Sequence, residues 1–226
     1  MKSYLSSIVL LAIAAVLAPQ QTSNVTSVPV EDEPLHKVVF KNDVVTVIHV
    51  LLAPGQTTLF HSHTHDRIAI DLSSAAITQQ KINEPETAPT QTKPGNISSL
   101  TLTEASYTHR VHNTGTTPYE VLDIEPAQRT ASPSPDVAAP VAAENPSAGV
   151  YNWVLAPGAT TPMHTHMRPY IIVSVTPFNL KMSSPDGQTA SHEVGAGDFR
   201  WVDAKITHNL SNVGSTPGQI IEVELK

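Results

Sequence analysis

The sequence LAPGQTTLFHSH at residues 52–63 occurs again as LAPGATTPMHTH at residues 155–166. Both copies carry a Pro-Gly turn, a pair of threonines and a His-x-His pair at the same spacing. A second block follows each of them, because residues 109–118 and 208–217 share His, Asn, Gly, Thr and Pro at equal spacing. Two blocks that recur in the same order indicate a duplicated domain.

Each copy is predicted to consist of short β-strands. Apolar and β-branched runs at 44–52 and 150–155 stop at the Pro-Gly turns, which is typical of strands. Four later segments alternate or run apolar, at 68–72, 119–124, 170–175 and 219–225. Short strands separated by Pro and Gly favour a sandwich or a barrel. We therefore predict an all-β protein of two tandem jelly-roll barrels.

The domain boundaries follow from composition. The N-terminal barrel is expected over residues 36–126 and the C-terminal barrel over residues 148–226. Residues 127–147 are rich in Ala, Pro and Ser and have no apolar period, which predicts a linker. A strap packed along both barrels is the alternative, because Val137 and Val141 would permit packing.

The N-terminus predicts an export signal at residues 1–21. Lys2 provides a positive start, residues 8–17 form an apolar core, and Ala15 and Ala18 are small. The core is too short to span a bilayer. We therefore expect a secreted or periplasmic protein without a stable membrane span. The sequence has no cysteine, so disulfides cannot stabilise the mature chain.

Composition narrows the class of protein and of partner. The 19 prolines and 10 glycines indicate many short segments, which argues against a helical bundle. The net charge is −7 and no basic stripe is present, so nucleic acid is not an expected partner. The exposed edges of a barrel would allow a homodimer to form, but the sequence itself does not indicate one.

The repeated histidines are candidate metal ligands. Alternate residues of a strand project to one face, so the two histidines of each His-x-His pair point the same way. The repeated later histidine is the natural third ligand. A solvated strand would explain one pair, but not the same triple twice. Three neutral imidazoles suit a divalent transition metal such as Fe, Mn, Cu, Ni or Zn. The predicted ligands are His61, His63, His109, His164, His166 and His208.

The other histidines are weaker candidates. His65 would lie on the same strand face as His61 and His63, but its counterpart in the second copy is Arg168, which is not a histidine. The remaining ones are expected at the surface or in hydrogen bonds, although one on the 44–52 strand could line the same cavity; these are His36, His49, His112 and His192.

These motifs resemble the two motifs of the cupin family. The first family motif runs Gly, five residues, His-x-His, three or four residues, Glu, and residues 55–67 and 158–170 are similar to it. The second ends in His, three residues, Asn, which is matched at 197–212 and, for its end, at 109–113. The resemblance covers nearly all of the mature chain apart from the linker. It implies a bicupin.

The chain departs from the family pattern at the glutamate, which is a usual metal ligand there. Arg67 takes that place in the first copy and Tyr170 in the second. The resemblance therefore implies three histidine ligands per half, with Arg67 and Tyr170 as candidate catalytic residues. Arg67 either binds an anionic substrate or pairs with Asp66 or Asp71 in a degenerate copy. Tyr170 is a weak ligand, a hydrogen-bond donor or a core aromatic.

The resemblance also implies a function. A metal held by three histidines keeps positions for a substrate and dioxygen, so a metal-dependent oxygenase or related oxidoreductase acting on a small organic molecule is expected. The alternative is a non-catalytic bicupin that binds a metal or a small ligand. A structural protein would leave six matching histidines unexplained. The cation of Arg67 opposes a metal, so we expect tighter metal binding in the second half.

Overall fold

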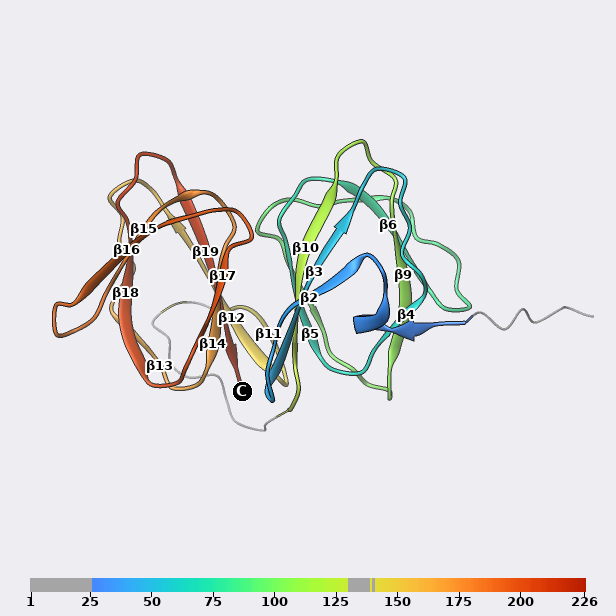
Figure 1. Ribbon diagram of the computed structural model, residues 1–226, viewed down its shortest axis with the longest axis horizontal. Coiled ribbons are helices and arrows are strands. Elements are labelled where there is room, and N and C mark those ends of the chain that lie inside the picture. The colour runs from blue at the N-terminus through green and yellow to red at the C-terminus, as the bar shows by residue number, and fades with distance from the viewer. Residues whose placement is uncertain (1–25, 130–138, 140) are drawn as a thin grey trace, which may run out of the picture.

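The computed structural model describes residues 26–129, 139 and 141–226, and this part of the chain is almost entirely β (Figure 1). The expected export signal at residues 1–21 lies outside the described residues. Within them, no helix has the length and apolar character needed to cross a membrane.

The first half forms two five-stranded sheets, ordered β1-β4-β9-β6-β7 and β2-β3-β10-β5-β8. A single turn of 3-10 helix, η1 (Val30–Asp32), follows the first strand. The strands are β1 (Val28–Pro29), β2 (His36–Lys41), β3 (Val45–Leu52), β4 (His61–His63), β5 (Arg67–Asp71), β6 (Ala76–Lys81), β7 (Thr90–Gln91), β8 (Ile97–Leu100), β9 (Tyr107–Asn113) and β10 (Tyr119–Pro126).

The second half repeats this plan with sheets ordered β11-β12-β19-β14-β17 and β13-β18-β15-β16. Its strands are β11 (Val141–Asn145), β12 (Ala148–Leu155), β13 (His164–His166), β14 (Tyr170–Ser174), β15 (Phe178–Ser183), β16 (Thr189–Val194), β17 (Phe199–Val202), β18 (Ile206–Asn212) and β19 (Gly218–Leu225).

Two boundaries differ from the sequence prediction. Regular structure begins before residue 36, because β1 pairs with β4 and Val30 is buried. The expected linker at 127–147 ends in a strand, since β11 pairs with β12. The prolines do not prevent this strand, because Pro146 lies in the turn after it, where the Asn145 side chain accepts backbone hydrogen bonds from Ser147 and Ala148. The described end of the segment is thus closer to the strap alternative.

The repeated Pro-Gly turn is tied to the repeated asparagine. Gly158 has a φ of +79°, in the left-handed region that favours glycine, and its N–H donates to the carbonyl of Asn212. The Asn212 side chain donates in turn to the carbonyl of Leu155 at 2.9 Å. Gly55 and Asn113 make the same bonds in the first copy. These repeated residues therefore hold each His-x-His strand against the strand of the third histidine.

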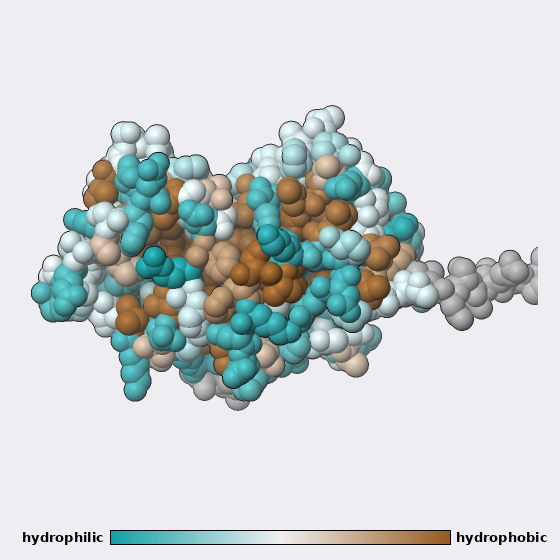
Figure 2. Space-filling view, viewed as in Figure 1, coloured by the Kyte–Doolittle hydropathy of each residue, from teal (hydrophilic) through white to brown (hydrophobic). Residues whose placement is uncertain are grey.

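The two barrels share one apolar core. The sheet of β3, β10 and β5 faces the sheet of β12, β19 and β14, and both lie at the centre of the molecule (Figure 1). Figure 2 shows apolar surface gathering where the two lobes meet. The largest cluster of buried side chains draws on both halves, including Ile68, Ile70, Ile124, Ile171, Val173 and Ile221. Strands β10, β14 and β19 are therefore buried on both faces, and separate clusters fill the two barrel interiors.

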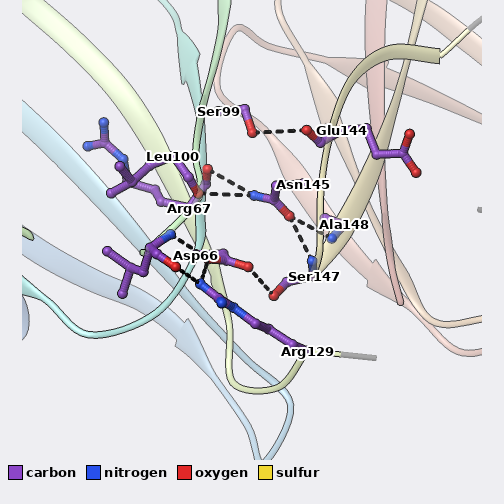
Figure 3. A network of polar contacts seen from close by, with 10 residues as sticks. Asp66, Arg67, Ser99, Leu100, Arg129, Glu144, Asn145, Ser147 and Ala148 are labelled. Atoms are coloured by element: carbon purple, nitrogen blue, oxygen red, sulfur yellow. Dashed lines mark hydrogen bonds and ion pairs between the residues drawn. The ribbon is translucent and has the colours of Figure 1, made fainter. Parts of the chain in front are cut away.

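A polar network joins the halves beside this core (Figure 3). Asp66 is buried and accepts hydrogen bonds from the backbone N–H of Leu102 and the hydroxyl of Ser147, each at 2.8 Å. Arg129 also pairs with it. The carboxylate of Asp66 thus fixes both ends of the segment that connects the barrels.

Candidate metal centre

Three histidines and one glutamate converge inside the second barrel. His164 and His166 lie on β13, His208 lies opposite His164 on the paired strand β18, and Glu222 reaches in from β19 of the other sheet. All four are buried, and one ligand atom from each lies within 4.8 Å of the others. Both sheets of the barrel therefore contribute to this cluster.

Hydrogen bonds decide which nitrogen of each histidine faces the cluster. The Nδ1 atom of His164 lies 2.9 Å from the carbonyl of Pro162, which only accepts, so Nδ1 carries the proton. The Nδ1 atom of His166 likewise lies 3.3 Å from the carboxylate of Glu224. In both rings the lone pair of Nε2 is therefore directed at the cluster.

The two carboxylate oxygens of Glu222 have different environments. Oε2 accepts a hydrogen bond from the indole N–H of Trp153 at 2.7 Å, which orients the carboxylate. Oε1 is buried and makes no hydrogen bond with the part of the chain that the structure describes, although it lies 3.2 Å from Nε2 of His208 and 3.3 Å from Nε2 of His166. An ionised oxygen that faces imidazole lone pairs needs a proton or a cation between them.

The spacing of these atoms fits a metal ion. Nε2 of His164 lies 2.9 Å from Nε2 of His208, and the contacts to Glu222 are 3.2–3.3 Å. Two donors bound at about 2.0–2.2 Å, at roughly 90–110° from each other, would lie about 2.8–3.6 Å apart. The donor set of three imidazoles and one carboxylate is also one that divalent transition metals accept.

The electrostatics of the second cluster are those of a negative site. Burial raises the pKa of Glu222, but the three adjacent histidines outweigh burial and hold the pKa well below its usual range. Burial lowers the pKa of His166, whereas Glu222 and Glu224 together raise it to about 9. The cluster thus favours a positive charge at its centre.

Tyr170 packs directly on this cluster. Its ring stacks on His166 with centroids 3.8 Å apart, and the side chain is fully buried. The hydroxyl makes no hydrogen bond with the described residues. Burial, followed by the charges of Glu222 and Glu224, raises the pKa of Tyr170 far above its usual range. Tyr170 is therefore a neutral hydrogen-bond donor beside the cluster.

The first barrel brings the other three predicted histidines together. His61 on β4 pairs in register with His109 on β9, and Nε2 of His63 lies 3.0 Å from Nε2 of His109. All three are buried, but no carboxylate joins their cluster among the described residues. Burial, and then the charge of His36, lowers the pKa of His61 to about 4. This is a neutral cluster.

The first barrel keeps its corresponding carboxylate out of the cluster. Asp123 takes the register position of Glu222, because Tyr119 pairs with Leu52 as Gly218 pairs with Leu155. Its Oδ2 instead lies 3.1 Å from Nη1 of Arg67, in an ion pair whose side chains are 2% and 14% exposed.

Arg67 therefore pairs with neither Asp66 nor Asp71, the two partners expected from the sequence. The actual partner lies on β10, a strand distant in the sequence that pairs with β5.

Sequence reasoning missed Glu222, which supplies a carboxylate from outside the first motif, where Arg67 and Tyr170 replace the glutamate. The signal was present in the last strand of each copy. The segments VLDIE at 121–125 and IIEVE at 220–224 place acidic residues at alternate positions of an otherwise apolar strand. A buried strand carries such charges only when they have partners.

The remaining histidines lie outside both clusters. His65 is exposed and lies 4.0 Å from Glu125. His49 pairs with Glu120 at 2.8 Å on the partly exposed face of β3. His36 is buried and pairs with Glu33 at 2.5 Å.

Similarity to known proteins identifies the fold family. No family model matches the chain. Over 92 residues it is 30% identical to the β-alanine degradation protein BauB of Pseudomonas aeruginosa, which covers 41% of this chain and 96% of that protein. A cupin 2 conserved barrel domain protein of Leptotrichia buccalis matches 84% of this chain and 88% of its own, with 10% identity and a TM-score of 0.53.

This chain belongs to the cupin family. Its two-barrel form also matches an oxalate decarboxylase of Bacillus subtilis that was studied for its Mn(II) centres, with 13% identity, a TM-score of 0.53, and coverage of 80% of this chain and 68% of that one. As a cupin, the chain departs from the expected pattern in its second half, where the carboxylate of the cluster comes from β19, which pairs with β14, the strand of Tyr170.

Proposed function

We propose that the second barrel is the active half of a metal-dependent oxidoreductase, or an oxygenase, that acts on a small organic molecule. The ligands are His164, His166, His208 and Glu222. The observation that carries the proposal is the buried Oε1 of Glu222, which makes no hydrogen bond with the described residues and lies within 3.3 Å of Nε2 of both His166 and His208. A divalent transition metal bound there would supply Lewis-acid or redox chemistry.

The residues around the cluster have separate tasks. Trp153 holds Glu222 through its indole N–H and stacks on His164 with centroids 5.2 Å apart. Tyr170 offers an O–H to a bound polar group. Apolar side chains such as Ile172 and Leu210, which are buried in the barrel interior, exclude water.

The first barrel is proposed to stabilise the protein rather than to react. Its three histidines lie near the guanidinium of Arg67. Burial lowers the pKa of His63, and the charge of Arg67 lowers it further. Asp123 is neutralised by the same arginine. Among the described residues of this half, no carboxylate joins the three histidines as Glu222 does in the other half; Glu125 contacts the three only at Nδ1 of His63, at 2.5 Å.

The metal assignment is tested by elemental analysis and calorimetric titration with Mn²⁺, Fe²⁺ and Zn²⁺. We expect one tightly bound ion per wild-type chain. The isosteric change Glu222→Gln should weaken binding at least tenfold, because it removes the only carboxylate of the set. The control Glu193→Gln changes an exposed carboxylate on β16 and should bind as wild type. Equal metal content in all three proteins would overturn the assignment.

Turnover is tested by oxygen consumption and product analysis with a panel of small phenols, diketones and organic acids. The name of BauB, which refers to degradation of the small organic acid β-alanine, supports including short carboxylic and amino acids. Turnover that requires the metal and Glu222 supports the oxidoreductase. A loaded protein that binds a panel member without converting it would instead be a non-catalytic bicupin.

Export is proposed on the sequence alone. The basic start and short apolar core of residues 1–21 support it. Cell fractionation combined with N-terminal sequencing of the mature protein tests it, and an intact Met1 in the cytoplasmic fraction would contradict it.

A further inference from the structure

A pocket opens at the side of the second barrel, between the edge strands β16 and β17. Its volume is about 280 Å³, just below the roughly 300–1,000 Å³ of pockets for drug-sized ligands. The walls come from both sheets and combine apolar residues, such as Ile172, Leu180, Met182 and Ile220, with polar and charged ones. None of the four residues of the metal cluster lines it. The pocket therefore suits a small, partly apolar molecule.

Strand register places this pocket beside the metal cluster. Glu222 on β19 pairs with Ile172 on β14, and Ile172 pairs with Arg200 on β17. Residues paired across antiparallel strands share a face, so these three side chains project to the barrel side in one row. Strands lie about 4.8 Å apart, which puts the backbones of Glu222 and Arg200 roughly 10 Å from each other. A molecule held at Arg200 would extend toward the cluster.

Arg200 is a cation without a partner. It lines the pocket and makes no hydrogen bond or ion pair with any residue that the structure describes. Asp198 also lines the pocket, but its carboxylate accepts the N–H of Gly195 at 2.7 Å. Glu193 on the edge strand β16 also lines the pocket, next to His192. Among the described residues of the lining, Arg200 is therefore the unpaired cation that an anionic ligand can reach.

The first barrel lacks this cation. Ala69 pairs with Ser98 as Ile172 pairs with Arg200, so Ser98 holds the same register position. The free arginine thus occurs in the half whose histidine cluster includes a carboxylate.

We infer that this pocket binds a small organic monocarboxylate, with the carboxylate on Arg200 and the apolar part against Ile172 and Ile220. A guanidinium binds a carboxylate through two parallel hydrogen bonds. The nearby acidic groups, Asp198 and Glu193, disfavour an anion with two charges. Binding of the monocarboxylate requires only the pocket. That the monocarboxylate is also the substrate of the metal site rests on the proposed function.

The test is calorimetric titration of the full chain with hexanoate, hexanamide and hexylammonium. Wild type should bind hexanoate best. Arg200→Gln should weaken hexanoate binding at least tenfold, because it removes a charge-assisted pair. Lys181→Gln is the matched control, since Lys181 lies on β15 between the lining residues Leu180 and Met182 and faces outward; it should change affinity less than twofold.

A second variant keeps the cation and removes the space. Ala190→Phe adds a ring at a residue that lines the pocket and should abolish hexanoate binding with Arg200 intact. Equal affinity of wild type and Arg200→Gln, or a preference for hexanamide or hexylammonium, would overturn the inference.

Failures of the two proposals are distinguishable. Hexanoate binding by a protein that holds no metal would overturn the proposed function alone, whereas metal binding without hexanoate binding would overturn the pocket alone. Retention of hexanoate binding in Glu222→Gln would support the pocket as an independent site.

Discussion

At the scale of single residues, buried charge separates the two halves of this cupin. Both carry a histidine triple and an acidic residue at the same register position, Asp123 or Glu222. Arg67 neutralises the first, whereas its counterpart Tyr170 leaves the second free to face the histidines. The difference between Arg67 and Tyr170 therefore decides which of the two barrels favours a bound cation.

Replacing Arg67 by methionine should have two effects. The metal-free protein should lose about 3–5 kcal/mol of stability, because Asp123 becomes an unpaired buried charge. Metal binding in the first barrel should rise, since Asp123 is released beside three histidines. Denaturant unfolding with and without Mn²⁺ measures both. Arg110→Met, at a partly exposed site on β9, serves as the control, and a variant that behaves like this control would contradict the assigned role of Arg67.

Asp71 should make stability depend on pH. Burial, supported by the charge of Asp123, raises its pKa from 3.8 to about 6. The folded chain therefore holds this proton more tightly than the unfolded chain, and stability is lost as the pH rises from about 4 to above 6. Asp71→Asn should melt at a higher temperature than wild type at pH 7 and at the same temperature below pH 4. The exposed Asp43→Asn is the control; a pH-independent difference for Asp71→Asn would contradict the argument.

At the scale of elements, β11 and the turns around it do more than connect the barrels. The strand extends the second barrel's sheet through its pairing with β12 and lies against β8 of the first barrel. Asp66, in the loop between β4 and β5, binds the residue that precedes β12 as well as Leu102 (Figure 3). The connection is thus held from both sides.

Asp66→Ala should loosen this connection. It leaves the backbone N–H of Leu102 and the side chain of Ser147 without their acceptor, which should cost about 2–4 kcal/mol. Ser147→Ala removes one of these bonds and should cost about 1 kcal/mol. Thermal melting measures the difference, and trypsin cleavage after Arg129 should accelerate only in Asp66→Ala. Equal melting temperatures for the two variants would refute the central role of Asp66.

At the scale of the whole molecule, the two barrels form one folding unit. Side chains from both halves make up the largest buried cluster, so each barrel covers apolar surface that the other would expose to water. This explains why β14, and β19 apart from Gln219, are buried although they belong to an antiparallel sheet.

Calorimetry should show a single unfolding transition with equal calorimetric and van't Hoff enthalpies. Ile221→Ala, within the shared core, should cost about 2–5 kcal/mol and lower this one transition as a whole. Val154→Ala is the control, because Val154 is 72% exposed and should change stability by no more than about 0.5 kcal/mol. Two separable transitions, only one of them shifted by Ile221→Ala, would show that the barrels unfold independently.

The sequence by itself determined the duplicated all-β architecture and the composition of both histidine triples. The repeated Pro-Gly turns and strand alternation are local signals, and His-x-His on a strand directs two side chains to one face whatever surrounds it. The observed strands β3, β5, β10, β12, β14 and β19 accordingly lie where the apolar runs predict them.

Only the tertiary structure decided the rest of the site. Glu222 joins the histidines because β19, from the opposite sheet, crosses the barrel beside them, and Asp123 is withheld because β5 places Arg67 against it. Both contacts join residues far apart in the sequence, and a local pattern contains no information on which strand will face which across a barrel. The burial that gives these charges their effect likewise exists only after the two barrels have closed and packed together.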